Sequence, residues 1–185
     1  WLADPAEEPE PFGDGGTKMA WNTFNVVSIY PNGNPVMSDV NQRWVGDCCA
    51  CAVIASMAYL YPRFVKHIIK DNMDKTYTVT MYDPKGKQIS VGVGGDYFIG
   101  NSGDLGALGG RNKEVTWATI LEKAMIKWNQ IYQGSSNVGG IGTEYVSAIF
   151  TGDGESVGFG ANALIAEDLQ RAVEVSLKQG RLVIG

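Results

Sequence analysis

The sequence predicts an α+β fold, because helix-type and strand-type hydrophobic patterns occupy separate parts of the chain. Strict alternation of apolar and polar residues between positions 76 and 93 predicts a β-hairpin, with Asp83-Pro84-Lys85-Gly86 as its turn. Apolar residues at helical spacing predict an amphipathic helix over residues 115–129, and an almost wholly apolar run over 48–61 predicts a helix buried at the centre of the fold. With 44% hydrophobic and 19% charged residues, a chain of 185 residues can bury the core that this fold needs.

The remaining elements follow from local composition. Residues 1–22 are acidic, rich in Pro and Gly and poor in residues to bury, so we expect a mobile tail. A β-prone run predicts a strand over residues 23–30. Pro62 suits the first turn of a second helix that continues to about residue 70. The glycine-rich residues 92–110 predict a long irregular loop that could line a cleft.

Three further elements are expected towards the C-terminus. A weaker helical pattern covers residues 143–150. Apolar residues from Ile165 onwards mark a last helix, which Gly180 ends. Residues 181–185 are apolar enough to begin a buried strand.

Charge and hydropathy disfavour two classes of partner. The net charge is −5 and there is no run of Lys or Arg, so the chain lacks the basic surface that nucleic acids require. No apolar stretch approaches the roughly 20 residues that cross a bilayer, so we expect no membrane span. Because the first residue is Trp1, we expect that a leader, pro-segment or tag has been removed. A secreted or cell-surface location then stays open, and the compartment is undetermined.

The three cysteines Cys48, Cys49 and Cys51 are too close in sequence to link distant segments by disulfides. Metal binding, redox chemistry, nucleophilic catalysis and simple burial remain as roles. Asp47 is a candidate N-cap for a helix that begins near Cys48. A thiol in the first turn of a helix lies at the positive end of the helix dipole, which favours the thiolate. The upstream Gln42 could then join the backbone N–H of the cysteine to stabilise an oxyanion.

These residues resemble a known family. Gln42-x-x-x-Gly46-Asp47-Cys48, followed by an apolar, Ala-rich helix, is similar to the catalytic-cysteine motif of the calpains, which reads Gln, three residues, then Gly-Asp-Cys-Trp. Residues 117–129 resemble the calpain helix built around Leu-Glu-Lys-Ala, and residues 139–152 resemble the segment that follows it. Residues 169–185 resemble the helix and strand that open the second calpain subdomain. Single short matches are weak, but an ordered series over roughly residues 36–185 is specific.

The resemblance implies a papain-like α+β fold that is incomplete in this chain. Residues 23–155 would form the cysteine-bearing subdomain, helical with a β-hairpin, and residues 156–185 would begin a second, β-rich subdomain completed outside this chain. The implied activity is cysteine endopeptidase hydrolysis of a protein or peptide substrate through an acyl-enzyme. Cys48 takes the nucleophile position and Gln42 the oxyanion position, and this chemistry requires no cofactor.

The sequence departs from the calpain pattern in two ways. Cys49 stands where calpains have Trp, which bears on the packing of the substrate cleft. The family's catalytic His and Asn come after the last residue of this chain, and the only histidine, His67, falls in the predicted second helix, where the family has no catalytic residue. A papain-type thiol needs an imidazole within about 2.6–3.2 Å. We therefore expect the chain alone to be inactive, and a downstream segment or companion chain from the same precursor to supply His and Asn.

The resemblance also suggests a calcium site. Asp39 and Glu114 lie close to the positions of the calcium-ligating acids of animal calpains, and carboxylate oxygens are suitable ligands for this ion. Three other interpretations stay open: a redox pair of Cys48 and Cys51, a zinc site made by the cysteines with His67, and a catalytically inactive calpain-like binding or regulatory module.

Overall fold

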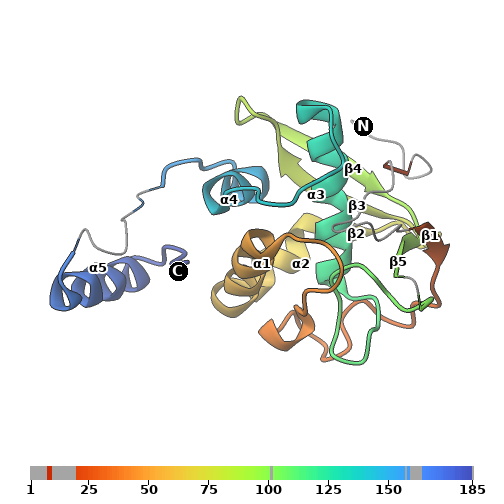
Figure 1. The fold of residues 1–185 in the computed structure, drawn as a ribbon, viewed down its shortest axis with the longest axis horizontal. Coiled ribbons are helices and arrows are strands. Elements are labelled where there is room, and N and C mark those ends of the chain that lie inside the picture. The colour runs from red at the N-terminus through yellow and green to blue at the C-terminus, as the bar shows by residue number, and fades with distance from the viewer. Residues whose placement is uncertain (1–7, 10–19, 101, 157, 159–163, 185) are drawn as a thin grey trace.

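In the computed structural model the chain forms a mixed fold in which helices pack around small antiparallel sheets (Figure 1). The structure describes residues 8–9, 20–100, 102–156, 158 and 164–184. The long helix α3 (Trp117–Gln133) lies between the sheet on one side and α1 (Cys48–Leu60) on the other. The mixture of helix and sheet agrees with the predicted α+β class.

A three-stranded antiparallel sheet is formed by consecutive segments in the order β2 (Ile69–Asp71), β3 (Tyr77–Tyr82) and β4 (Gln88–Val93). Strands β3 and β4 are the predicted hairpin, and their register pairs Val79 with Val91 and Met81 with Ile89. Side chains along β3 alternate between buried and half-buried positions, because successive residues of a strand point to opposite faces. The prediction of this hairpin is confirmed.

A second, two-stranded sheet pairs β1 (Ala20–Thr23) with β5 (Asp96–Ile99) in antiparallel register. The prediction of a strand over residues 23–30 is therefore wrong in its position, since the strand lies in residues assigned to the tail. Farther along the chain, the carbonyl of Ile29 accepts a hydrogen bond from the backbone N–H of Trp117 at 2.8 Å, so this stretch meets α3 and not a strand. Most of the predicted tail, residues 1–7 and 10–19, lies outside the described residues.

The other helices are η1 (Met37–Asp39), α2 (Pro62–Ile68), α4 (Thr143–Thr151) and α5 (Ala166–Lys178). Pro62 opens α2, as predicted, because its fixed φ suits the first helical position. Gly134 ends α3 with a φ of 71°, a left-handed conformation that glycine adopts without strain. Helix boundaries thus follow the local signals in the sequence closely.

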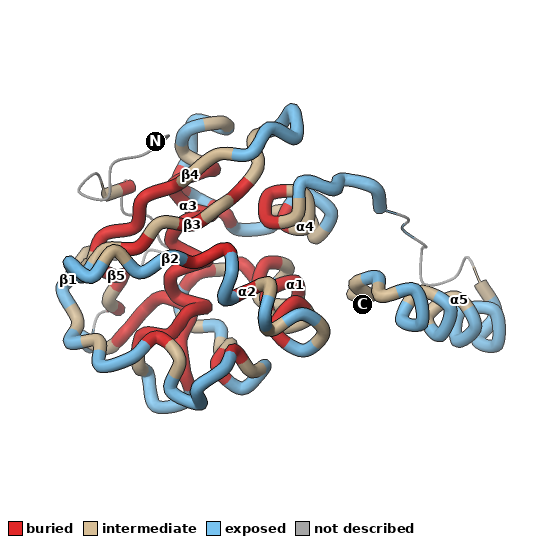
Figure 2. Tube along the Cα trace, turned by 180° about the vertical axis from the view of Figure 1, so that it is seen from behind, coloured by how far each residue is buried: buried red, intermediate tan, exposed pale blue. Residues whose placement is uncertain are grey.

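The burial of the helices differs from the prediction. Every residue of α3 from Trp117 to Asn129 is buried, including Glu122, Lys123 and Lys127, whereas α1 is exposed at Cys48 and Tyr59 (Figure 2). Both helices form where the sequence predicts them, but α3 is buried on all sides over residues 117–129 instead of on one face, and α1 is buried only in part. The reason is that the charged side chains of α3 find polar partners inside the fold, which the sequence pattern alone does not reveal.

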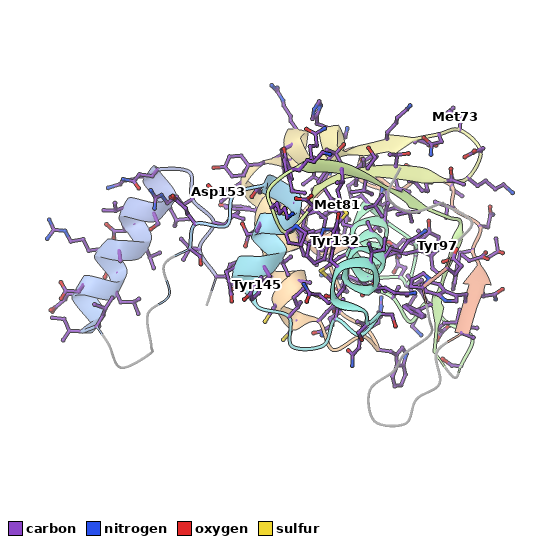
Figure 3. The ribbon with its side chains drawn as sticks, turned by 90° about the horizontal axis from the view of Figure 1, so that it is seen from above. Met73, Met81, Tyr97, Tyr132, Tyr145 and Asp153 are labelled. Carbon is purple, nitrogen blue, oxygen red and sulfur yellow. The ribbon has the colours of Figure 1, made fainter. Side chains whose placement is uncertain are left out.

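Figure 3 illustrates the same division between interior and surface. Met81 of β3 and Tyr97 of β5 are fully buried, and both lie within the body of the molecule. Met73, in the turn between β2 and β3, and Tyr145, on α4, point away from it and are 87% and 63% exposed.

Helix α5 lies apart from the rest of the described structure in Figures 1 and 2. It has no buried residue, and Leu169 and Val175 are 45% and 47% exposed. The hydroxyl of Tyr61 donates a hydrogen bond to the carbonyl of Gly180. The strand predicted from residue 181 onwards is not formed by the described residues 181–184, which pair with no other strand.

Among the described residues, no single helix is both long enough and apolar enough to cross a membrane. Helices α1 and α2 reach that length and composition only when taken together, and the chain bends by 113° between them.

Candidate active site

Cys48 is the first residue of α1, and it is exposed. Asp47 precedes it at the N-cap position, as predicted. The thiol therefore lies in the first turn, where the N–H groups of the helix have no acceptor within the helix itself. This is an accessible thiol beside the positive end of a helix dipole.

Gln42 lies in the loop that leads into α1, and its side chain is also exposed. Its amide Nε2 donates to the carbonyl of Val45 at 2.9 Å, which fixes the side chain against its own loop. The loop is held in turn by the glycine-rich segment: the Trp44 N–H donates to Gly106 O at 3.0 Å, and Arg43 Nη2 donates to Gly110 O at 2.6 Å. The glycine-rich segment thus supports the loop that bears Gln42.

Glycine is required at two positions of the glycine-rich segment whose carbonyls accept bonds from the Gln42 loop, Gly106 from Trp44 and Gly109 from Asn41. A Cβ on Gly106 would lie 2.9 Å from the backbone nitrogen of Gly100, and one on Gly109 would lie 2.6 Å from the carbonyl oxygen of Glu114. Both contacts are shorter than real Cβ atoms show, and both partners are backbone atoms that cannot rotate away. The glycines therefore let this segment fold closely against its own backbone and the residues that follow it.

The other two thiols are less suited to act as nucleophiles. Burial raises the pKa of the Cys51 thiol far above its usual range, with further contributions from Asp47 and Glu122. The pKa of Cys49 is also raised, first by desolvation and then by Cys48 and Glu144. A raised thiol pKa leaves less thiolate at neutral pH, and the thiolate is the reactive species.

Two buried acids, Asp47 and Glu122, lie near the thiol of Cys51: each residue is only 1% exposed, and each contributes to the raised pKa of that thiol. Glu122 Oε2 also accepts the backbone N–H of Leu108 at 2.9 Å, and Cys51 Sγ donates to Asp47 Oδ1 at 3.5 Å. Desolvation and the neighbouring Asp47 raise the pKa of Glu122 well above its usual value, against the lowering effect of the Leu108 N–H.

Glu122 is not among the site residues predicted from the sequence. A signal was present in the helical spacing. Glu122 shares a face of the helix with Ala118, Met125 and Ile126, and a charged residue within an apolar stripe needs a buried partner.

His67 lies in the last turn of α2 and is exposed. It forms no hydrogen bond among the described residues, so the structure does not associate it with Cys48. In that same part of the chain, no group of three or more His, Cys, Asp and Glu residues is arranged to hold a metal ion. Neither finding supports the zinc interpretation.

Asp39 and Glu114 do not form an obvious calcium site. The carboxylate of Asp39 is 2% exposed and accepts hydrogen bonds from Trp117 Nε1 at 2.7 Å, Asn32 Nδ2 at 2.9 Å and the Val36 N–H at 3.3 Å. A cation would have to displace these donors from both oxygens. Glu114 Oε2 is buried without a hydrogen-bond partner in the described structure, so this oxygen is available to a cation. Calcium binding stays a prediction.

Comparison with known proteins gives one result that bears on these residues. A search of curated proteins found no match. The model of the calpain family of cysteine proteases matches residues 21–183, which include Gln42, Cys48 and the whole of α3 and α4. The match covers most of the chain, so the chain belongs to the calpain family of cysteine proteases.

Proposed function

We propose that this chain carries the nucleophile of a cysteine endopeptidase with a papain-like fold. The Cys48 thiolate attacks the carbonyl carbon of a peptide bond, and the carbonyl oxygen becomes an oxyanion. The Gln42 side-chain amide and the backbone N–H of Cys48 donate hydrogen bonds to that oxyanion. Collapse of the tetrahedral intermediate expels the amine and leaves a thioester acyl-enzyme, which water then hydrolyses to the acid and free thiol.

The observation that carries this proposal is the position of Cys48. It is exposed at the first residue of α1 within a calpain-family match, while Cys49 and Cys51 are each partly buried and have raised pKa values. The Gln42 amide now donates to Val45, so we expect it to exchange this carbonyl for the oxyanion when substrate binds.

A complete active site requires a base and an orienting group from elsewhere. The amine that leaves must receive a proton, and an imidazole held by Asn or a similar side chain supplies it in papain-type chemistry. The chain has one histidine, His67, in the exposed last turn of α2. We therefore propose that a downstream segment or companion chain contributes His and Asn, and that these 185 residues alone are inactive.

The alternative function is a calpain-like binding or regulatory module without catalysis. Both proposals predict the same fold, so a test must report on the thiol and not on folding. An irreversible peptidyl epoxide inhibitor is suitable, because it alkylates only a thiol that is activated and accessible within a substrate cleft.

The experiment treats the full-length protein with a peptidyl epoxide and measures the labelling of each cysteine by peptide mass spectrometry. We expect Cys48 to be labelled at least about tenfold faster than Cys49 or Cys51. The Cys48→Ala variant should lose labelling and peptidase activity, whereas the matched Cys51→Ala variant should keep both. Equal labelling of the three thiols would refute the endopeptidase and leave the binding module.

A further inference from the structure

The ammonium group of Lys123 lies in the interior, where α3 meets β1 and β5, and the side chain is 2% exposed. Its Nζ donates hydrogen bonds to the carbonyl of Gly94 at 3.2 Å and to the carbonyl of Asp96. These bonds use two of the three N–H donors of the ammonium group, and both acceptors are uncharged. The nearby Asp96 charge raises the pKa of Lys123 less than Glu8 does. The buried cation therefore depends on an anion from another segment.

Glu8 supplies this anion from the N-terminal part of the chain. Its Oε2 lies 2.5 Å from Lys123 Nζ, and its side chain is 22% exposed, so the carboxylate reaches the interior from the surface. The next residue is bound as well, because Trp21 Nε1 donates to the carbonyl of Pro9 at 2.8 Å. Two consecutive residues are thus held, one through the charge of its side chain and the other through its main chain.

Aromatic rings surround the ammonium group. Lys123 Nζ lies 4.7 Å from the centroid of the Trp21 ring and 5.3 Å from the centroid of the Tyr97 ring. Trp21 stacks on Phe98 in turn, with the two ring centroids 3.8 Å apart. Rings at these distances attract the cation and keep water away from it, so solvent screens its attraction to a carboxylate only weakly. The surroundings of Lys123 therefore favour a carboxylate over water as its partner.

The sequence of the N-terminal segment suits this site. Residues 7–11 read Glu-Glu-Pro-Glu-Pro, so a Glu-Pro pair occurs at Glu8-Pro9 and again at Glu10-Pro11. A residue that precedes proline is restricted to extended conformations, which lowers the entropy lost on binding. Residues 8 and 9 belong to no helix or strand, so their bonds to Lys123 and Trp21 are bonds that a separate peptide could also make.

We propose that Lys123 and Trp21 form a peptide-binding site for acidic Glu-Pro segments, and that the N-terminal segment of this chain fills it. The glutamate carboxylate pairs with Lys123, and the carbonyl of the following proline accepts the Trp21 indole N–H. A tethered segment occupies such a site at an effective concentration of about millimolar, which excludes free peptides. The strands β1 and β5 lie on the other side of α3 from α1 (Figures 1 and 2), so this inference does not depend on the role of Cys48.

The test uses the full-length protein and a fluorescent peptide with the sequence of residues 4–12. Replacing Glu7, Glu8 and Glu10 together by Ala empties the site and prevents a neighbouring glutamate from taking the place of Glu8. We expect this triple variant to bind the peptide at least about tenfold more tightly than the wild type, as measured by fluorescence anisotropy. A peptide with Gln in place of the three glutamates should not bind. Equal affinity of the triple variant and the wild type, or equal binding of the two peptides, would overturn the proposal.

A substitution at the cation shows whether the peptide occupies this site. Adding Lys123→Met to the triple variant removes the charge but keeps an apolar side chain of similar length, so peptide binding should be lost. Adding Lys113→Met is the matched control, because the partner of Lys113 is the exposed Asp104, and it should leave binding unchanged. Peptide binding that survives Lys123→Met would place the peptide elsewhere and overturn the proposal.

A single substitution keeps the inference testable if the triple variant does not fold. Lys123→Met leaves no buried cation, and the carboxylate of Glu8 can then turn to the solvent. Release of the segment should raise the oxidation of Trp21 by hydroxyl radicals at least about twofold, as read by peptide mass spectrometry, whereas Lys113→Met should not change it. Equal oxidation of Trp21 in the wild type and in Lys123→Met would show that Lys123 does not hold the segment.

Discussion

Replacing Glu8 by Gln should destabilise the protein far more than breaking an ion pair of equal length elsewhere. Lys123 Nζ lies 2.5 Å from Glu8 Oε2, and the two side chains are 2% and 22% exposed. Lys113 Nζ lies at the same 2.5 Å from Asp104 Oδ2, but those side chains are 50% and 44% exposed. The two pairs therefore differ in burial and hardly at all in distance.

Removal of one partner from a buried ion pair costs about 3–5 kcal/mol, because it leaves the other charge in a medium of low polarity. The partial exposure of Glu8 favours the lower end, about 3 kcal/mol. Lys123 would keep its hydrogen bonds to the carbonyls of Gly94 and Asp96 and its contact with the Trp21 ring, 4.7 Å from the ring centroid. It would lose its directly paired carboxylate and keep only the weaker attraction of the Asp96 charge. For a chain of this size, about 3 kcal/mol lowers the unfolding midpoint by about 6–12 °C.

The assay is thermal unfolding of Glu8→Gln and Asp104→Asn at neutral pH, with the second variant expected to unfold at nearly the wild-type temperature because its pair is solvated. Burial lowers the pKa of Lys123 despite the opposing effect of Glu8. Losing Glu8 should lower the pKa of Lys123 further. The unfolded state then binds more protons than the native state over a wider range of pH below 10.5, so the stability of the variant should recover as the pH rises through that range. Equal shifts for the two variants, or a deficit that does not shrink with rising pH, would refute the reasoning.

Three further predictions concern acidic side chains. Glu122 has a raised pKa in the folded state, so between about pH 4.5 and that pKa the native protein holds more protons than the unfolded chain, and stability should fall as pH rises. Urea unfolding measured over this pH range should show a shallower fall in stability for Glu122→Gln than for the wild type. Parallel curves of stability against pH would contradict the raised pKa. Replacing Asp39 by Ala leaves the indole N–H of Trp117 unsatisfied in the core and should cost about 3 kcal/mol. Asp39→Asn should cost less, because its side-chain oxygen still accepts the indole N–H. If calcium raises the unfolding temperature of the wild type but not of Glu114→Gln, the predicted calcium role gains support; no effect on the wild type would contradict it.

Local signals predicted the elements that depend on neighbouring residues. The hairpin of β3 and β4 follows from alternation and a turn, and the start of α1 at Cys48 follows from Gly46-Asp47. The position of Gln42 upstream of that helix was likewise clear from the sequence, although its role is still a proposal. These features need no knowledge of distant segments.

The burial of α3 could not be predicted in the same way. Its charged residues are accommodated by groups outside the helix: Lys123 by Glu8 and by carbonyls near β5, and Glu122 by the backbone N–H of Leu108. Hydrophobic periodicity predicts that a charged residue lies on the surface, because the pattern within one helix contains no information about a partner on another element. The prediction of a strand at the C-terminal end is wrong for a related reason. A strand needs a neighbouring strand to pair with, and residues 181–184 have none in the described structure.

The backbone contacts of the loop that bears Gln42 have a consequence for how this protein can change. Main-chain hydrogen bonds join this loop to the glycine-rich segment, from the N–H of Asn41 to the carbonyl of Gly109 and from the N–H of Trp44 to the carbonyl of Gly106. Such bonds do not depend on the identity of the residues in the loop, only on partners small enough to approach. Mutational drift should therefore be permissive at position 44, whose bond to the segment comes from its main chain, and restrictive at Arg43, whose side chain bonds Gly110, and at Gly106 and Gly109. The exposed side of the loop is then free to diversify on a support that stays fixed.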